Sequence, residues 1–179
     1  MGTPKATLEI AGRPLISYPL AAARAAGLET FVVAKRDSPL PELECPVVEE
    51  PDEPRHPLTG VIAALEHAAG PVVVLACDAP LVPAPLIAAL ASSPEPLAVP
   101  AHPRAQPLIA RYSPSLLPRL RAALTGGESL TSLLEDLGGA RLGEAELREF
   151  GDPEAMFANV NRPADAVALG RLEGRPDRR

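Results

Sequence analysis

Apolar residues recur along the chain with two spacings, one typical of helices and one typical of buried strands. Over residues 58–69 they follow the i, i+3, i+4, i+7 spacing of an amphipathic helix that starts at Leu58, and Gly70 ends it. Residues 72–76 are then continuously apolar, which predicts a strand that is covered on both faces, as in a parallel sheet. A helix followed by such a strand is the repeating unit of an α/β fold.

The rest of the chain continues this alternation. The sequence predicts helices over residues 15–26, 58–69, 84–91, 114–124, 129–137 and 163–172, strands over residues 31–33, 46–49, 72–76, 97–99 and 108–110, and a short strand or turn over residues 157–161. This order favours an α/β fold with a doubly wound, mostly parallel sheet in a single domain over residues 1–172, followed by a charged, disordered tail over residues 173–179. Ligands of such sheets bind beyond the carboxyl ends of the strands, so residues at strand ends are the candidates for a site.

The composition of the chain argues against some classes of binding partner. The chain of 179 residues has a formal net charge of −6, no Trp, three Phe and two Tyr, so it lacks a basic face for nucleic-acid phosphates and aromatic platforms for bases. No apolar stretch reaches the roughly 18 residues of a membrane helix. Cys45 and Cys77 form neither a C-x-x-C pair nor a zinc pattern, which favours two reduced thiols. We therefore expect a cytoplasmic protein that binds small molecules, with no nucleic-acid or membrane partner.

Asp78 is the sharpest candidate for chemistry, because it stands just beyond the apolar run over residues 72–76. A carboxylate so close to a buried strand is unfavourable unless a cation or hydrogen-bond donors accompany it. At a carboxyl strand end it is placed to bind Mg²⁺ beside a substrate phosphate. The alternative is an Asp that caps the turn or helix before Pro80 and Pro83.

Three further residues are candidates for holding a nucleotide. Lys5 follows a glycine-bearing segment and could neutralise triphosphate oxygens, or it is an exposed lysine without such a role. Glu50 lies in an acidic run over residues 49–53 and could accept hydrogen bonds from a base or help a metal, or it belongs to a solvated loop. Gly60 lies in the segment that opens the helix over residues 58–69, whose N-terminal amides suit an anion, although ordinary capping explains that segment equally well.

Three amide side chains suit a polyfunctional heterocycle that both donates and accepts hydrogen bonds. Gln106 lies beside a strand start, and Asn159 and Asn161 stand two residues apart, so on an extended segment they point to the same side. For Asn161 the alternative is a turn-forming role before Pro163. The three histidines are scattered and no Ser has a nucleophile-elbow context, so covalent catalysis has little support.

The order of these pieces along the chain resembles the molybdenum cofactor guanylyltransferase family. The resemblance is carried by Met1–Lys5, Gly12–Leu15, Pro57–Gly60, Cys77–Pro80, Gln106–Pro107 and Asn159–Pro163. It implies a Rossmann-like nucleotidyltransferase fold of the nucleotide-diphospho-sugar transferase type and a Mg²⁺-dependent transfer of GMP from GTP to molybdopterin that carries molybdenum, with release of pyrophosphate. The small-molecule partners would be GTP and molybdopterin, and the protein partners would be molybdenum-insertion proteins or acceptor molybdoenzymes.

The resemblance also implies roles for single residues. Lys5 and Asp78 would be catalytic, with Lys5 on the triphosphate and Asp78 on the nucleotide and Mg²⁺. Glu50 and Gly60 would complete the nucleotide site. The amides of Gln106, Asn159 and Asn161 would face the pterin. Nucleotidyl transfer needs no protein nucleophile, because a phosphate oxygen of the pterin attacks the α-phosphorus, so positioning and charge neutralisation suffice.

The chain departs from the family pattern at its start and near the base. Family members begin with a strand and a Leu-Ala-Gly-Gly-type loop, whereas this sequence begins at the Met-Gly that follows them. We hypothesise that the printed start is an internal Met; if it is the true start, we expect poor GTP binding and a fragile fold. Pro4 replaces an acidic residue, His56 replaces a glycine, and Ala34 or Lys35 replaces an asparagine, which puts guanine specificity in doubt.

Two alternatives therefore stand beside the guanylyltransferase hypothesis. The chain could use CTP on molybdopterin, or act on another phosphorylated acceptor, within the same fold. It could instead be a cofactor-binding or chaperone module without turnover, for which the missing loop is the best support.

Overall fold

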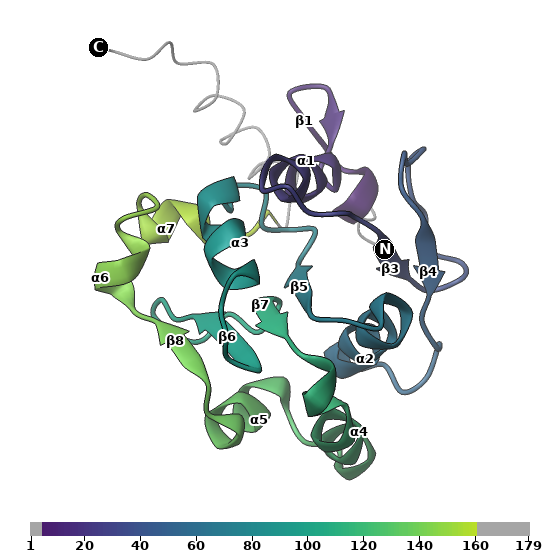
Figure 1. The fold of residues 1–179 in the computed structure, drawn as a ribbon. Helices are drawn as coiled ribbons and strands as arrows, with labels where there is room; N and C mark the ends of the chain where they lie inside the picture. Colours follow the sequence, from purple (N-terminus) through teal and green to yellow (C-terminus); the bar gives the residue numbers. More distant parts are fainter. Residues whose placement is uncertain (1–4, 161–179) are drawn as a thin grey trace.

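The computed structural model describes residues 5–160 of the chain as helices on both sides of short strands (Figure 1). The α-helices are α1 (Ser17–Ala25), α2 (Pro57–Ala68), α3 (Ala84–Ala91), α4 (Leu117–Gly126), α5 (Leu130–Leu137), α6 (Glu144–Leu147) and α7 (Pro153–Met156), with 3₁₀ turns η1 (Lys5–Thr7) and η2 (Pro114–Leu116). The strands are β1 (Glu9–Ile10), β2 (Arg13–Pro14), β3 (Val32–Ala34), β4 (Val47–Glu49), β5 (Val72–Leu75), β6 (Leu97–Pro100), β7 (Ile109–Tyr112) and β8 (Ala140–Leu142).

The strands form three sheets within the described residues. A four-stranded sheet has the order β5-β7-β6-β8, a second sheet pairs β3 with β4, and a two-stranded ribbon pairs β1 with β2. β3 and β4 are parallel in the register Val32↔Val47, and β6 and β8 are parallel as well. The helix–strand alternation and the α/β class that the sequence predicted are therefore confirmed.

The pairing around β7 differs from the mostly parallel sheet that we expected. β7 runs antiparallel to both β5 and β6, with Val72 opposite Tyr112 and Leu97 opposite the same Tyr112. The reason is the connection between β6 and β7, because residues 101–108 contain no helix that could carry the chain back for a parallel return. The apolar run of β6 and the first two residues of β7, Ile109 and Ala110, are buried, as in a parallel sheet, so their composition did not reveal the direction.

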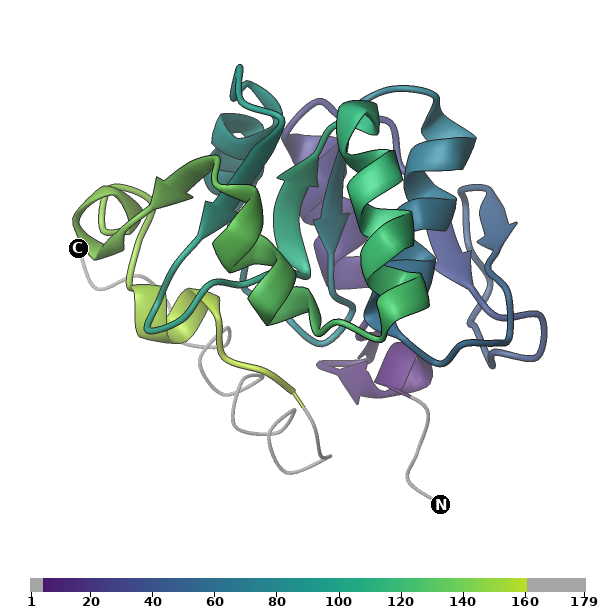
Figure 2. The ribbon, with the colours of Figure 1, turned by 90° about the horizontal axis from the view of Figure 1, so that it is seen from below.

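Helices cover both faces of the four-stranded sheet, as Figures 1 and 2 show from two directions. On one face α2, α4 and α5 pack against side chains such as Val74, Val99 and Tyr112. On the other face α3 packs against Ala98 and Ile109, together with Met156 and Phe157 from the last described segment. The two apolar layers hold β5, β6 and β7 between them and so fix where these strands end.

The local caps follow from the sequence. Pro57 occupies the first turn of α2, where its missing N–H is not needed, and Ala69 ends that helix in a left-handed conformation with φ 49°. α1 ends just before Gly27, whose φ of 78° suits the glycine that the sequence pattern placed there.

Some predicted elements do not coincide with the observed helices and strands. No strand forms over residues 157–160. The helix expected over residues 163–172, the side chain of Asn161 and the tail over residues 173–179 lie outside the described residues. The sequence patterns missed β8, α6 and α7, which are too short to show a period. Within residues 5–160, no helix has the length and apolar character needed to traverse a lipid bilayer.

Candidate functional site

An ion pair marks the carboxyl end of β5. Asp78 lies in the turn that follows this strand, and its Oδ2 accepts a hydrogen bond of 2.7 Å from Nζ of Lys5, 73 residues earlier in the chain. The two side chains are partly open to solvent, with 44% of Lys5 and 21% of Asp78 exposed. The lysine thus supplies the cation that a carboxylate at the end of a buried strand requires. The structure brings these two predicted site residues into direct contact.

A second polar group lies where β3 and β4 end. Lys35 follows β3 and donates from Nζ to the backbone oxygens of Pro51, at 2.7 Å, and Asp52, at 2.9 Å. The same Nζ is 3.8 Å from Oε1 of Glu50, which follows β4. Lys35 therefore anchors the acidic loop and holds a positive charge against Glu50.

Glu50 also lies against the first turns of α2. Its Oε2 is 2.9 Å from the position that a Cβ would take on Gly60, closer than real Cβ contacts come. Gly60 therefore leaves the space that the Glu50 carboxylate occupies. The structure brings these two predicted nucleotide-binding residues together, and both of them line a cavity.

The N-terminus of α2 is capped by its own chain. Nδ1 of His56 accepts a hydrogen bond of 3.1 Å from the N–H of Leu58, and the Thr59 hydroxyl donates to the oxygen of Pro54 at 3.0 Å. Ordinary capping, the alternative that the sequence left open, is what the structure contains here. An anion that binds the N–H of Leu58 would have to displace the His56 ring.

The amide residues differ in their surroundings. Nε2 of Gln106 donates to the backbone oxygens of His102, at 2.9 Å, and Arg104, at 3.3 Å, so it stabilises its own loop. Asn159 is exposed, and the next residue, Val160, donates its N–H to the backbone oxygen of Asp78 at 2.9 Å. The chain around Asn159 therefore reaches the turn that carries Asp78, whereas the donors of Gln106 are engaged locally.

Cys77 reports on the electrostatics of this turn. Burial raises the pKa of its thiol above the ordinary value, the neighbouring carboxylate of Asp78 raises it further, and Lys5 opposes that rise. The thiol is therefore kept protonated at neutral pH. It is a poor nucleophile or metal ligand in this state.

Asp78 is the carboxylate best placed to hold a metal ion. No group of three or more His, Cys, Asp or Glu side chains suited to a metal occurs among residues 5–160. One carboxylate is enough for Mg²⁺, which keeps several waters and takes its other ligands from substrate phosphates. The donor set therefore fits a metal that arrives with a phosphorylated substrate and does not fit a metal caged by protein alone.

Sequence reasoning missed the position of Lys35 beside Glu50, since Lys35 was considered only as a departure from a family pattern. It follows β3 directly, just as Asp78 follows β5 closely. Position after a buried strand is the feature that could have identified it.

Comparisons with known proteins give consistent results. A family model described as MobA-like NTP transferase domain matches residues 1–143. The molybdenum cofactor guanylyltransferase of Serratia proteamaculans is 34% identical over 97% of this chain and 88% of its own. The crystal structure of molybdopterin-guanine dinucleotide biosynthesis protein A from Archaeoglobus fulgidus superposes with a TM-score of 0.78 at 24% identity, covering 96% of this chain and 91% of the other. The 2-C-methyl-D-erythritol 4-phosphate cytidylyltransferase of Thermus thermophilus has the same fold, with a TM-score of 0.69 at 23% identity and coverage of 95% and 94%.

Proposed function

Because the chain belongs to the MobA-like NTP transferase family, we propose that it transfers GMP from GTP to molybdopterin that carries molybdenum, giving the guanine dinucleotide cofactor and pyrophosphate. The support is the similarity to a molybdenum cofactor guanylyltransferase, which extends over 97% of this chain. The nucleotidyltransferase fold is shared by the structures that it superposes on.

The observation that carries the chemical proposal is the contact between Lys5 and Asp78 at the end of β5. In the reaction an oxygen of the terminal phosphate of molybdopterin bonds to the α-phosphorus of GTP, and the bond from that phosphorus to the α–β bridging oxygen breaks. The charge that builds up on the departing pyrophosphate needs a cation, and the ammonium of Lys5 can turn from Asp78 to supply it. No side chain has to become covalently attached to the nucleotide.

Asp78 is the residue that would hold Mg²⁺. Bound there with phosphate oxygens, the ion would neutralise triphosphate charge and align the α-phosphorus. Asp78 is partly exposed, which leaves room for the waters that Mg²⁺ retains. Lys5 neutralises the carboxylate while substrate is absent.

The other predicted residues divide between the two substrates. Glu50 would accept hydrogen bonds from the base of the nucleotide, and Gly60 would leave room for that carboxylate. Lys35 would keep Glu50 oriented. Asn159 and Asn161 would face the pterin; Gln106 would contribute through the loop that it stabilises.

The test is pyrophosphate release by the purified chain supplied with GTP, Mg²⁺ and molybdopterin carrying molybdenum. Replacing Asp78 by Asn should lower turnover at least about 100-fold, the usual loss when one charge-stabilising group is removed. Asp136→Asn is the matched control, because Asp136 also pairs with a cation, Arg119, but on α5. Unchanged turnover in Asp78→Asn would refute the role of the ion pair.

The same assay distinguishes the alternatives. GTP should be preferred over CTP, and a preference for CTP would replace the guanylyltransferase proposal by a cytidylyltransferase one. Binding of the molybdenum-pterin without any consumption of nucleotide would favour a module without turnover.

We place this reaction in the cytoplasm and propose acceptor molybdoenzymes or molybdenum-insertion proteins as the partners that receive or supply the cofactor. Both described cysteines are free thiols, which is the usual state of cysteine in that compartment.

A further inference from the structure

Three strands of the four-stranded sheet end at the same edge. β7 runs antiparallel to both β5 and β6, so β5 and β6 run in the same direction, and β8 is parallel to β6. His102 follows β6 and Glu144 follows β8 at the edge where Asp78 follows β5. Ligands of such sheets bind along this edge. The histidine therefore belongs to the border of the candidate site, although the proposed reaction gives it no role.

The ring of His102 lies between two carboxylates that come from different helices. Its Nδ1 is 3.7 Å from Oε2 of Glu144, in α6, and its Nε2 is 3.7 Å from Oε2 of Glu154, in α7. Only 18% of the histidine side chain is exposed. A neutral imidazole has one N–H and an imidazolium has two, so in either state at least one N–H faces a carboxylate. The ring thus connects the segment after β6 to α6 and α7, and we call this contact the His102 bridge.

A neighbouring cation keeps one of the two carboxylates charged. Nη2 of Arg148 donates a hydrogen bond of 2.6 Å to Oε1 of Glu144. This hydrogen bond and the charge of Arg148 lower the pKa of Glu144 below its ordinary value, and His102 contributes less to the same effect. Glu144 is therefore ionised at neutral pH, with one oxygen towards Arg148 and the other towards the His102 ring.

The His102 bridge also carries the loop of Gln106. Nε2 of Gln106 donates to the backbone oxygen of His102, and its N–H donates to the oxygen of Pro100, both at 2.9 Å. The N–H of Ala76 donates to the oxygen of Leu108 at 2.7 Å, so the start of β7 lies beside the end of β5. A displacement of His102 would therefore move Gln106 relative to the turn that follows β5.

We propose that His102 is a positioning residue for the substrate that accepts the nucleotide. The His102 bridge keeps residues 101–106 against α6 and α7, and so places the amide of Gln106 for hydrogen bonds with the pterin. It acts through this loop and not on the reacting phosphates. Removing it should weaken binding of the acceptor and leave the nucleotide and the chemical step unchanged. This inference rests on the proposed function, because it assigns the acceptor to the same site.

Steady-state kinetics of His102→Leu test the proposal, since leucine keeps much of the volume of the ring and removes both nitrogens. The KM for molybdopterin carrying molybdenum should rise about 10-fold, which corresponds to the loss of one hydrogen bond. The KM for GTP and kcat should change less than about 2-fold. A histidine that only supported the fold would lower the amount of active chain, and hence kcat, without moving one KM, and that result would overturn the proposal.

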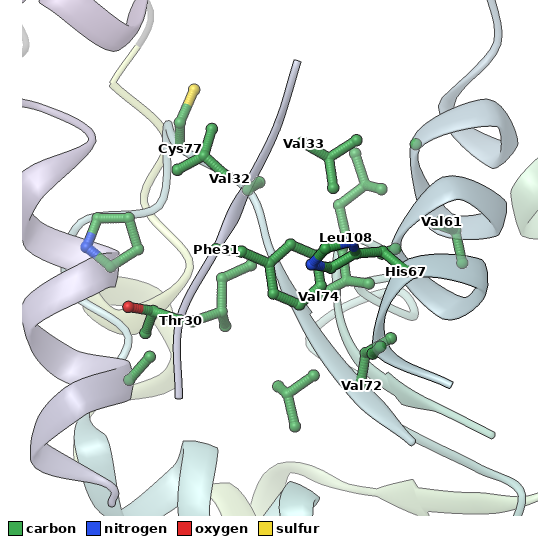
Figure 3. Close-up of a pocket in the computed structure, with 18 of the residues that line it drawn as sticks. Thr30, Phe31, Val32, Val33, Val61, His67, Val72, Val74, Cys77 and Leu108 are labelled. Carbon is green, nitrogen blue, oxygen red and sulfur yellow. The ribbon is translucent and has the colours of Figure 1, made fainter. Parts of the chain in front are cut away.

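His67→Leu is the matched control, because it makes the same substitution at the wall of a cavity away from the His102 bridge. The rings of His67 and Phe31 have their centroids 4.8 Å apart, as Figure 3 shows from inside the cavity. Phe31 precedes β3, so this pair lies at the start of a strand and not at a carboxyl end. Neither KM should change in this variant. An equal rise in the KM for molybdopterin would remove the special role of His102.

The two carboxylates provide a second test. Glu144→Gln combined with Glu154→Gln should raise the KM for molybdopterin as His102→Leu does, and adding His102→Leu should raise it no further, because all three side chains form one contact. If the effects multiply instead, His102 acts without its carboxylates and the His102 bridge is contradicted.

Two measurements separate this proposal from the proposed function. The amide of Gln106 should exchange its hydrogen about 10-fold faster in His102→Leu, with the amide of Ala76 as the unchanged internal control. Equal exchange of the Gln106 amide would contradict the His102 bridge whether or not the chain turns over. If the wild-type chain transfers no GMP, the proposed function fails, and the dissociation constant for molybdopterin carrying molybdenum replaces KM. Equal dissociation constants for wild type and His102→Leu would then overturn this proposal, and no binding by wild type would overturn both.

Discussion

Strands of similar apolar character are buried to different extents on the two sides of the molecule. β6 is an apolar run and β7 is apolar except for Arg111, and all residues of both strands are buried, because neighbours pair with both edges and helices cover both faces. β5 is just as apolar, yet Val73, Val74 and Leu75 stay partly exposed, and Val47 of β4 is 52% exposed. The inner strands β6 and β7, which have partners on both edges, are therefore well packed, whereas β5 at the edge of the same sheet and β4 are not.

Leucine truncation should show the largest difference between the two sides. Leu97→Ala, in fully packed β6, should reduce the free energy of unfolding by about 3 kcal/mol, because it leaves a cavity in a close-packed region. Leu75 already lines a cavity, so Leu75→Ala should reduce the free energy of unfolding by only about 1 kcal/mol. Urea denaturation of residues 1–179 measures both, and equal losses would mean that the two sides are packed alike.

A glycine pair gives the next largest contrast. Gly139 has φ 101°, and a Cβ there would be 2.6 Å from the backbone oxygen of Leu97, so Gly139→Ala should cost about 2 kcal/mol. Gly60→Ala meets chiefly the carboxylate of Glu50, the far end of a flexible side chain, and gains helix propensity, so stability should change by less than about 0.5 kcal/mol. Thermal unfolding of both variants is the measurement, and a destabilised Gly60→Ala would show that Glu50 is held rigidly.

Replacing Lys35 tests how strongly this residue stabilises the acidic loop after β4. Lys35→Met removes two hydrogen bonds to the acidic loop and should destabilise the chain by about 1 kcal/mol. Arg36→Met is the control, since its pair with Glu49 is exposed and its loss should leave the stability nearly unchanged. Equal losses of stability for the two variants in denaturant titrations would contradict the anchoring role of Lys35.

The smallest expected effect is in the reactivity of a thiol. Burial and the charge of Asp78 raise the pKa of Cys77, so less thiolate exists at a given pH than for an ordinary thiol. Asp78→Asn removes the second cause and should shift the pH profile of Cys77 alkylation to lower pH. Mass spectrometry follows the modification site by site, and a profile that stays in place or moves to higher pH would contradict this electrostatic account.

The sequence predicted long elements and strand-end residues well because their causes are local. The helix from Pro57 has a clear period and a proline start, and the run into β5 is apolar throughout. Asp78 and Lys5 were both candidates, but their contact joins residues 73 positions apart and no local pattern encodes it. The assignment of catalytic and binding roles to these residues remains a prediction.

Other features depend on contacts between distant parts of the chain, so the sequence alone could not predict them. The antiparallel direction of β7 follows from the connection before it, not from its own composition. β8 owes its place to pairing with β6, where Ala98 lies opposite Ala140, and three residues cannot show a period. The anchoring hydrogen bonds of Lys35 require the loop after β4 to fold back, which spacing along the chain does not reveal.

The packing of Val160 has a consequence for how the protein matures on the ribosome. Val160 is fully buried in a cluster with Ile10, Leu15 and Tyr18, and its N–H holds the turn of Asp78. Those early residues leave the ribosomal tunnel long before their late partner has been made, by roughly 10 to 30 seconds at usual translation speeds. The nascent chain therefore carries this apolar surface uncovered until synthesis is nearly finished, which is the period when it is most prone to aggregate.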